Sequence, residues 1–211
     1  MPSSSPFHIT VASLGCSRGD RRLFSDVSFD LGTGAALHLE GANGSGKTTL
    51  LRTIAGMTQA DSGEINWCGQ PIREAGDEYR QQVVYVGHLN GLQPELNLLE
   101  NLRYAVGLSG YDTNPDRLAS TIEQLGLTSR AHLPTKLLSQ GQKRRAALCR
   151  LGVGSQALWL LDEPLTALDK ESIKVLLAMF NQHLANGGLI IYTSHQTLDL
   201  AGNVTRLRLG A

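Results

Sequence analysis

The sequence has no long apolar run and no excess of charge of either sign. Its 211 residues include 19 basic and 19 acidic side chains, so the formal net charge is +0. The surface as a whole therefore has no electrostatic attraction for nucleic acid. No stretch approaches the roughly 18 consecutive apolar residues of a membrane-spanning helix. The first ten residues lack a charged segment followed by an apolar one, so we expect no secretory signal.

Cysteine is also scarce. The three cysteines are Cys16, Cys68 and Cys149, and no two of them form a C-x-x-C pair. Reduced thiols with a packing role are the simplest interpretation. No cysteine or histidine spacing is typical of a zinc site or a haem ligand. Four scattered histidines receive no role: His8, His38, His132 and His183.

The chain does contain a phosphate-binding pattern. Residues 41–48 read GANGSGKT and match G-x-x-x-x-G-K-[ST], between an apolar run at 35–39 and a helix-like run at 49–55. In that context glycines let backbone N–H groups surround a phosphate, and the helix start adds a positive dipole. A chance glycine-rich turn is the alternative. The predicted nucleotide-binding residues are Gly41, Ala42, Asn43, Gly44, Ser45, Gly46, Lys47, Thr48 and Thr49. Lys47 supplies positive charge, and the Thr48 hydroxyl suits Mg²⁺, which prefers oxygen ligands.

A second acidic element follows an apolar strand at 158–161. Asp162 ends this strand, where a carboxylate of a P-loop protein can hold Mg²⁺ through water. Glu163, pointing the other way if the strand continues, is a candidate base for the water that attacks the γ-phosphate. The alternative is an Asp-Glu-Pro turn that caps a helix.

Two further segments are weak evidence for a nucleotide site when each is taken alone. The sequence Ser139-Gln140-Gly141-Gln142 opens a helical pattern, where Ser139 and the Gly141 backbone can donate to phosphate oxygens, although in isolation a plain N-cap is the better explanation. His195 follows an apolar run at 189–193 and can reach a γ-phosphate, or can be an ordinary polar strand end.

Apolar strands alternate with helical patterns along the chain. We expect strands at 8–14, 27–31, 35–39, 64–68, 83–86, 158–161, 189–193 and 204–209, the last at a sheet edge. Helices are predicted at 98–106, 115–125, 139–151 and 169–184, with Asn114 as an N-cap and Gly126 as a stop. This order predicts an α/β fold with a parallel core sheet. Residues 1–88 and 151–211 form the expected core of a single domain, and about 89–150 an inserted helical lobe.

These elements together resemble an ATP-binding cassette (ABC) domain. GANGSGKT, LSQGQ, LLDEP, the TALD ending at Asp169 and the TSH ending at His195 occur in the order of that family and cover nearly the whole chain. The short distance between Lys47 and Ser139 resembles transporter cassettes. The resemblance implies a P-loop NTPase of the ABC type, with an antiparallel β subdomain, that hydrolyses ATP with Mg²⁺.

The resemblance also implies an assembly. Two copies pack head to tail as a homodimer, with ATP between the P-loop of one and residues 139–142 of the other. Asp169 then lies near the dimer seam, His195 senses the γ-phosphate, and hydrolysis drives integral membrane permease subunits.

The chain departs from the family pattern at two positions. His88 stands where cassettes usually carry a glutamine that touches Mg²⁺ and the attacking water, and imidazole is the poorer ligand for a hard ion. Arg18 stands where an aromatic residue usually stacks on adenine; a guanidinium can stack on a base too. Each residue can instead be a solvated loop side chain. With Arg18 we expect weak discrimination between ATP and GTP.

Within the family, several segments resemble the ATPase subunit of the bacterial haem exporter of cytochrome c maturation. They are the 41–44 loop, His88, the strand before Asp162, the 144–151 run and the 193–196 segment. This implies a peripheral protein at the cytoplasmic face of the inner membrane, with further maturation proteins as potential partners and no direct haem contact. The alternatives are a transporter ATPase with another cargo and a soluble nucleic-acid-associated cassette.

Three other features complete the sequence predictions. Leu89, Leu92 and Leu96 either face a membrane partner or pack under their own lobe. The basic run 143–145 is expected to form a solvated helix face rather than a nucleic-acid site. Trp67, Trp159 and Cys149 are expected to be packing residues.

Overall fold

The computed structural model describes residues 7–108 and 114–210. A five-stranded parallel sheet forms its centre, in the order β6-β7-β8-β3-β9. The strands are β3 (Ala35–Glu40), β6 (Val83–Val86), β7 (Leu158–Asp162), β8 (Leu189–Thr193) and β9 (Asn203–Arg208). The predicted parallel α/β core is therefore confirmed, and β9 lies at the sheet edge as expected.

The central strands are buried on both faces. Every residue of β7 and β8 is buried. Successive side chains of a strand point to opposite faces, so Leu158 and Leu160 join the hydrophobic cluster on one side of the sheet, while Trp159 and Leu161 join the cluster on the other. This explains why these strands read as continuous apolar runs rather than alternating ones.

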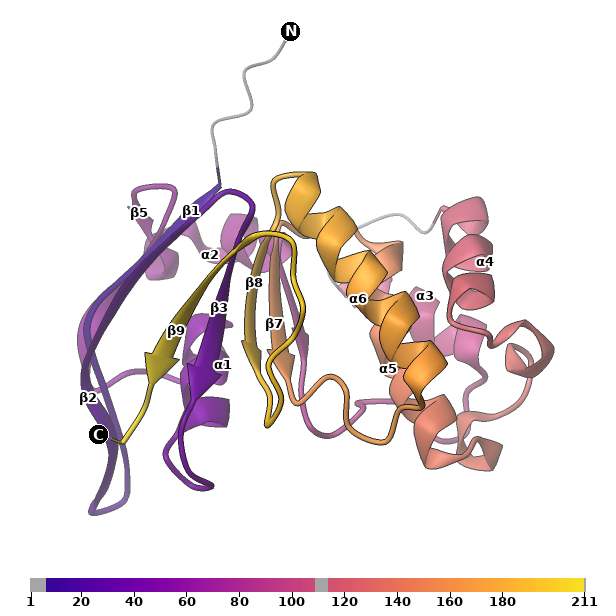
Figure 1. Ribbon diagram of the computed structural model, residues 1–211, viewed down its shortest axis with the longest axis horizontal. Helices are drawn as coiled ribbons and strands as arrows, with labels where there is room; N and C mark the ends of the chain where they lie inside the picture. Colours follow the sequence, from indigo (N-terminus) through magenta and orange to yellow (C-terminus); the bar gives the residue numbers. More distant parts are fainter. Residues whose placement is uncertain (1–6, 109–113, 211) are drawn as a thin grey trace, which may run out of the picture.

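An antiparallel sheet lies beside the parallel one, at the left of Figure 1. Its order is β2-β1-β4-β5, with β1 (His8–Arg18), β2 (Arg21–Gly32), β4 (Ser62–Trp67) and β5 (Gln70–Pro71). The first two strands are longer than predicted, because β-bulges let the pairing continue to Arg18↔Arg21. Both arginines consequently stand at the tip of one hairpin.

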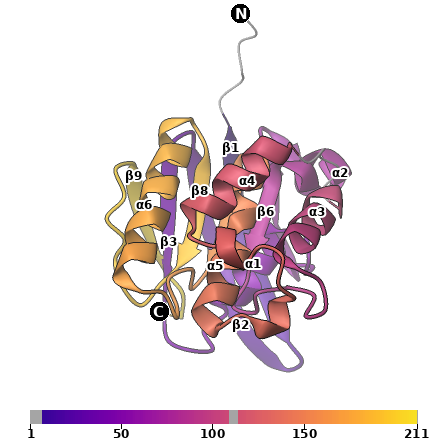
Figure 2. The ribbon, with the colours of Figure 1, turned by 90° about the vertical axis from the view of Figure 1, so that its right-hand side faces the viewer.

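Helices cover both faces of the parallel sheet. Helix α1 (Lys47–Ile54) packs between the two sheets, where its Leu50, Leu51 and Ile54 are fully buried. The opposite face is covered by α5 (Gln140–Val153) and α6 (Lys170–Ala185), and α3 (Leu98–Leu108) and α4 (Pro115–Gln124) pack on α5. Figures 1 and 2 show α3, α4 and α5 together on one side, with the short 3₁₀ helices η1 (Thr128–Arg130) and η2 (Thr135–Leu137) in the same chain segment.

The helix ends carry the predicted caps. The Asn114 side chain accepts hydrogen bonds from the backbone N–H groups of Asp116 and Arg117, and Gly126 follows α4 with a φ of 66°. Helix α2 (Ile72–Gln82) was not predicted, since only Tyr79 of its residues is buried and Gly76 interrupts it with non-helical angles. Its apolar positions Ile72, Ala75 and Tyr79 do follow a helical spacing, but they are few and the residues between them are polar.

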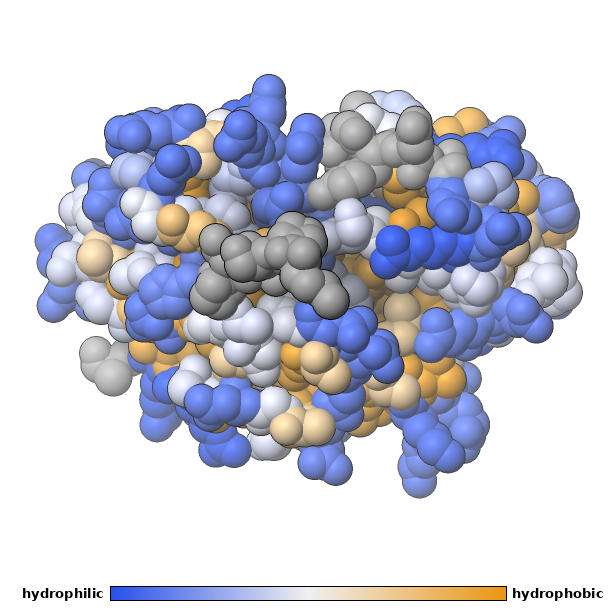
Figure 3. Space-filling view, turned by 90° about the horizontal axis from the view of Figure 1, so that it is seen from above, coloured by the Kyte–Doolittle hydropathy of each residue, from blue (hydrophilic) through white to orange (hydrophobic). Residues whose placement is uncertain are grey.

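The face seen from above in Figure 3, at the amino ends of the parallel strands, is largely hydrophilic, with hydrophobic residues showing only in small areas. Within the described residues, no helix combines the length and the apolar character that crossing a membrane requires.

The buried residues expected to pack do so. Trp67 and Trp159 are 8% and 5% exposed, and Cys149 is fully buried, which raises the pKa of its thiol to about 12. His183, which had no predicted role, stacks on Trp159 with ring centroids 3.8 Å apart. Its Nε2 donates to the carbonyl oxygens of Ala157, at 3.1 Å, and Leu189, at 3.3 Å. One imidazole thereby joins α6 to β8 and to the residue before β7.

His183 makes stability depend on pH. Burial lowers its pKa from 6.5 to about 4, so the folded protein keeps the ring neutral while the unfolded chain protonates it below pH 6.5. The unfolded state then binds the extra proton, and the free energy of unfolding falls as pH falls from 6.5 toward 4. Between pH 7 and 5 we expect this group to remove about 2 kcal/mol. Urea unfolding of the wild type and His183→Gln at both pH values measures it.

The exposed His132 provides the matched control. His132→Gln should show the same pH dependence as the wild type, whereas His183→Gln should lose about 2 kcal/mol of it. Equal pH dependence in all three proteins would contradict the assignment.

Candidate nucleotide-binding site

The loop between β3 and α1 has the backbone that the 41–48 pattern predicts. Gly41, Gly44 and Gly46 have φ values of 148°, 79° and 98°, a region that L side chains rarely adopt. A Cβ atom on Gly46 would lie 2.9 Å from a ring carbon of Phe24, and one on Gly41 would lie 2.6 Å from the Ser45 hydroxyl. Glycine is thus required at both positions to form the turn that leads into α1.

Lys47 lies along this loop. Its Nζ donates to the carbonyl oxygens of Gly41, at 2.8 Å, and Ala42, at 3.1 Å. The ammonium group therefore sits beside the first N–H groups of α1, which have no partner within their helix. A positive charge and free helix amides at one place form a binding site for an anion such as phosphate.

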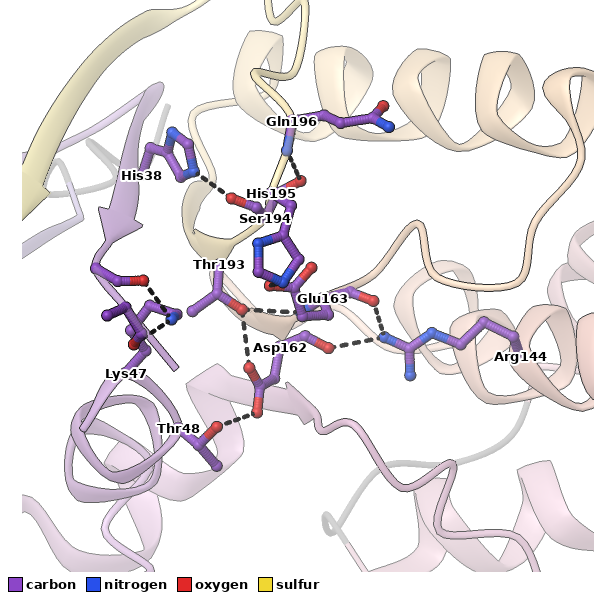
Figure 4. A network of polar contacts seen from close by, with 12 residues as sticks. His38, Lys47, Thr48, Arg144, Asp162, Glu163, Thr193, Ser194, His195 and Gln196 are labelled. Atoms are coloured by element: carbon purple, nitrogen blue, oxygen red, sulfur yellow. Dashed lines mark hydrogen bonds and ion pairs between the residues drawn. The ribbon is translucent and has the colours of Figure 1, made fainter. Parts of the chain in front are cut away.

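A chain of hydrogen bonds links α1 to the ends of β7 and β8 (Figure 4). The Thr48 hydroxyl donates to Asp162 Oδ2 at 2.7 Å, and the Thr193 hydroxyl donates to Asp162 Oδ1 at 2.8 Å. The parallel register pairs Asp162 with Thr193, which brings those two side chains together. Asp162 is 3% exposed, yet both of its carboxylate oxygens accept hydrogen bonds. This satisfies a carboxylate that burial alone would destabilise.

Glu163 does not continue the strand as the sequence predicted. Strand β7 ends at Asp162, and Glu163 has a left-handed φ of 50°. Its backbone N–H donates to Thr193 Oγ1 at 2.9 Å, and its carbonyl accepts from Arg144 at 2.8 Å. Side chains thus hold both the N–H and the C=O group of Glu163 at the turn. The turn, and not strand alternation, directs the Glu163 carboxylate.

That carboxylate faces the predicted histidine. His195 Nε2 lies 3.6 Å from Glu163 Oε1. The segment carrying His195 is held from behind by His38, whose Nε2 donates to the Ser194 carbonyl at 3.1 Å and whose ring stacks on Tyr192. His38 is 3% exposed, so this histidine, without a predicted role, supports the loop of His195.

Most of the predicted nucleotide-site residues line one cleft of about 540 Å³, whereas Gly41, Ala42 and Ser45 belong to the same loop but not to this lining. The cleft brings together the P-loop, the strand ends and the two unusual positions. Its lining is Arg18, Arg21, Leu23, Asn43, Gly44, Gly46, Lys47, Thr48, Thr49, His88, Asp162, Glu163 and His195. For Arg18 and His88, the sequence analysis left open whether each is a site residue or a solvated loop residue. Both line the same cleft as Lys47 and Glu163.

Residues 139–142 lie apart from this cleft. Among the described residues that line it, none belongs to 139–142, and Asp169 is not one of them. Ser139 caps α5 in a reciprocal capping box with Gln142. Asp169 caps α6 by accepting from the Ser172 N–H at 2.8 Å, and this bond lowers the pKa of its carboxyl group. Within one copy, both segments act as helix caps.

The prediction of a solvated basic face at 143–145 is wrong for Arg144. Lys143 and Arg145 are half-buried, but Arg144 is 4% exposed and its guanidinium points into the protein. The charge of the run led to the prediction that Arg144 is exposed, because an arginine is rarely buried unless it has partners. Those partners are backbone carbonyls at the ends of other elements, which no local pattern reveals.

Sequence reasoning also missed two contributors to the site. The Thr193 hydroxyl bonds both Asp162 and Glu163, and Arg21 donates to the Gly44 carbonyl at 3.3 Å. A threonine ending a buried strand was a detectable signal, since the adjacent parallel strand ends in Asp162. The role of Arg21 was missed because the β1–β2 hairpin is longer than the sequence predicted.

Comparisons with known proteins identify the family of this chain. A family model described as ABC transporter matches residues 24–166. Two proteins with the name cytochrome c biogenesis ATP-binding export protein CcmA are similar to this chain. That of Nitrosomonas europaea is 45% identical over 92% of this chain and 91% of its own, and that of Haemophilus influenzae is 39% identical over 96% and 95%.

Solved structures show the same fold. An ATP-binding subunit of an ABC transporter superimposes with a TM-score of 0.84 at 26% identity, covering 96% of this chain and 88% of that one. A putative ABC transporter ATP-binding protein from Pyrococcus furiosus gives 0.82 at 24% identity, over 96% and 97%. The chain belongs to the ABC transporter family of ATP-binding, ATP-hydrolysing domains. Within it, the chain is similar to the CcmA proteins of cytochrome c biogenesis.

Arg18 yields a test of nucleotide choice. A guanidinium presents the same flat surface to adenine and guanine, so the wild type should bind ATP and GTP within about 3-fold of each other. Arg18→Ala should weaken both nucleotides by about 5-fold, the effect of losing one stacking partner. Competition of each nucleotide against a fluorescent analogue measures both numbers.

Arg22→Ala removes a charge from the same hairpin outside the cleft lining and serves as the control, which should leave both affinities unchanged. A tenfold preference of the wild type for ATP, or equal effects of the two substitutions, would refute this role of Arg18.

Proposed function

We propose that this chain is the ATP-hydrolysing subunit of a CcmA-type export complex that serves c-type cytochrome biogenesis. The carrying observation is that Lys47, Thr48, Asp162, Glu163 and His195 meet in one cleft at the carboxyl ends of parallel strands. The similarity to the CcmA proteins over more than nine-tenths of the chain supports the cytochrome role. Energy from hydrolysis would drive haem export or release of a haem chaperone.

The glycine loop and Lys47 are the proposed triphosphate grip. The N–H groups of the loop and of the start of α1 offer donors to phosphate oxygens, apart from that of Ser45, which donates to the Ala42 carbonyl at 3.2 Å. Lys47 exchanges its loop carbonyls, at 2.8 and 3.1 Å, for phosphate oxygens when the nucleotide enters. Both Arg18 and Thr49 line the cleft. Arg18 contacts the base of the nucleotide, and Thr49 contacts its phosphates.

The residues at the cleft floor fit Mg²⁺. Thr48 Oγ1 and Asp162 Oδ2 are hard oxygen donors 2.7 Å apart, and Mg²⁺ is usually held by one or two such groups together with phosphates and water. The described residues include no group of three or more His, Cys, Asp and Glu side chains arranged to hold a metal by themselves. We propose Thr48 as a ligand and Asp162 as a ligand through water; the bound ion would neutralise phosphate charge.

Glu163 is the proposed general base. Its carboxylate accepts a proton from the water that attacks the γ-phosphate, while the bonds to its N–H and carbonyl keep it fixed. His195, 3.6 Å away, donates toward the γ-phosphate. His88, which also lines the cleft, hydrogen-bonds the same water at the position where other cassettes carry glutamine.

The second half of the site comes from a second copy. Ser139, Gln140, Gly141 and Gln142 begin α5, and a helix start with a serine hydroxyl suits a phosphate. Since these residues lie apart from their own cleft, we propose that they close over the nucleotide held by the partner in a head-to-tail homodimer. Asp169 then lies at the seam between the copies.

Membrane permease subunits are the proposed partners, at the cytoplasmic face of the bacterial inner membrane. Of the three leucines in the loop after His88, Leu89 is 84% exposed, whereas Leu92 packs partly against the core. Leu89 is therefore the proposed contact for a permease. The proposed division is a single domain, with a core of 1–88 and 151–211 and a helical subdomain at about 89–150. Neither nucleic acid nor direct haem contact enters this function.

Glu163→Gln tests the function. It preserves size and hydrogen bonding but cannot accept the proton, so ATP turnover should fall by about 100-fold or more. ATP affinity should be retained. In cells, the variant should leave c-type cytochromes without covalent haem, seen by haem staining of gels, while other haem proteins persist.

Glu171→Gln, an exposed carboxylate in the first turn of α6, is the matched control and should behave as the wild type. Normal turnover by Glu163→Gln would disprove the catalytic role. Loss of turnover with normal c-type cytochromes would instead mean that the transporter carries another cargo.

A further inference from the structure

Arg144 is a buried cation at the centre of the site's supporting structure. It extends from α5 and uses all three guanidinium nitrogens. Its Nε donates to the Pro164 carbonyl at 3.2 Å. Its Nη1 donates to the Gly87 carbonyl at 2.7 Å and to Asn90 Oδ1 at 3.3 Å. Its Nη2 donates to the carbonyls of Asp162 and Glu163, each at 2.8 Å. Figure 4 shows it beside the turn that carries Glu163.

Such burial is costly without compensation. Desolvation of the guanidinium lowers the pKa of Arg144, and the nearby charge of Asp162 opposes that effect. Within the described residues, Arg144 has no ion pair within 4.0 Å, and its charge is met by five oxygen acceptors. A planar fork of five N–H donors can serve them at once, whereas the ammonium group of lysine has three.

The acceptors of Arg144 lie in two functional segments. One is the turn 162–164 after β7, which carries Asp162 and the left-handed Glu163. The other is the end of β6, where Gly87 immediately precedes His88. Arg144 itself belongs to α5, whose first turn is capped by Ser139. The Arg144 side chain thus fixes the positions of Glu163, His88 and helix α5 relative to one another.

We propose that Arg144 is a positioning residue for hydrolysis: it holds the Glu163 turn and the Gly87–His88 backbone in register with the start of α5. This rests on the proposed ATPase mechanism. Arg144 is absent from the lining of the nucleotide cleft, so it acts through the peptide groups of Glu163 and Gly87 and not on the nucleotide.

The link has a consequence for the two copies of a dimer. A shift of α5, when its capped end meets the partner's nucleotide, is transmitted by a rigid, fully hydrogen-bonded guanidinium to the turn of Glu163 in the same chain. Closure of α5 over the nucleotide of the partner would thereby set the geometry of Glu163 at the chain's own nucleotide site.

The test compares Arg144→Lys and Arg144→Gln with the wild type as purified full-length proteins. Arg145→Lys is the matched control, since Arg145 follows on the same helix and donates to the Leu125 carbonyl, away from both functional segments. We expect ATP affinity within about 3-fold of wild type in all proteins. In the two Arg144 variants kcat should fall at least about 10-fold, since small displacements of a catalytic group have effects of that size.

A second readout needs no nucleotide. Amide hydrogen exchange in the nucleotide-free chain should quicken at residues 87–90 and 162–166 in the Arg144 variants, and stay unchanged at 41–54 and in β8. Arg144→Lys should exceed Arg144→Gln in kcat, because it restores the charge and part of the bonding. A general packing role would instead quicken exchange throughout the core and weaken ATP binding together with kcat.

The outcomes separate the two proposals. If the wild type hydrolyses ATP and Glu163→Gln does not, the proposed function stands; kcat and local exchange of Arg144→Lys and Arg144→Gln equal to those of Arg145→Lys would then overturn the role of Arg144 alone. Uniformly faster exchange with lost ATP binding would also overturn it. A wild type without Mg²⁺-dependent turnover would overturn both.

Discussion

The parallel register between β7 and β8 is the constraint on which the site depends. It pairs Asp162 with Thr193. The pairing of β3 with β8 places the start of the glycine loop at the same carboxyl ends of the strands. Thr48 then completes the contact from the first turn of α1. A slip of one residue in β7 would turn Asp162 to the opposite face of the sheet and separate it from both threonines.

This edge is held by polar groups inside an apolar sheet. Thr193 is fully buried, yet its hydroxyl both donates to Asp162 and accepts from Glu163. Arg144 and His38 add further bonds to backbone carbonyls on either side. A satisfied buried network is rigid, and an unsatisfied one is costly. The exposed His195 and His88 stand on this fixed base, where they can respond to a ligand.

The sequence was sufficient for features whose cause is local. The apolar runs of β7 and β8, the glycine loop, the caps at Asn114 and Ser139 and the order of the motifs all depend on neighbouring residues. Features that depend on partners distant in the sequence were missed. The turn at Glu163 requires Thr193 and Arg144, the burial of Arg144 requires carbonyls at 87 and 162–164, and His183 requires Trp159. Helix α2 was missed because it has few apolar residues and Gly76 interrupts it.

The central claim is that the glycine loop and its lysine bind a triphosphate at the carboxyl edge of the parallel sheet. Equilibrium binding of ATP to the wild type and to Lys47→Ala, with exposed Lys170→Ala as the control, tests it most directly. The structure predicts that Lys47→Ala binds ATP at least about 10-fold more weakly, since a hydrogen bond to a charged group is lost, while Lys170→Ala binds normally. Equal affinity of all three proteins for ATP would contradict the account.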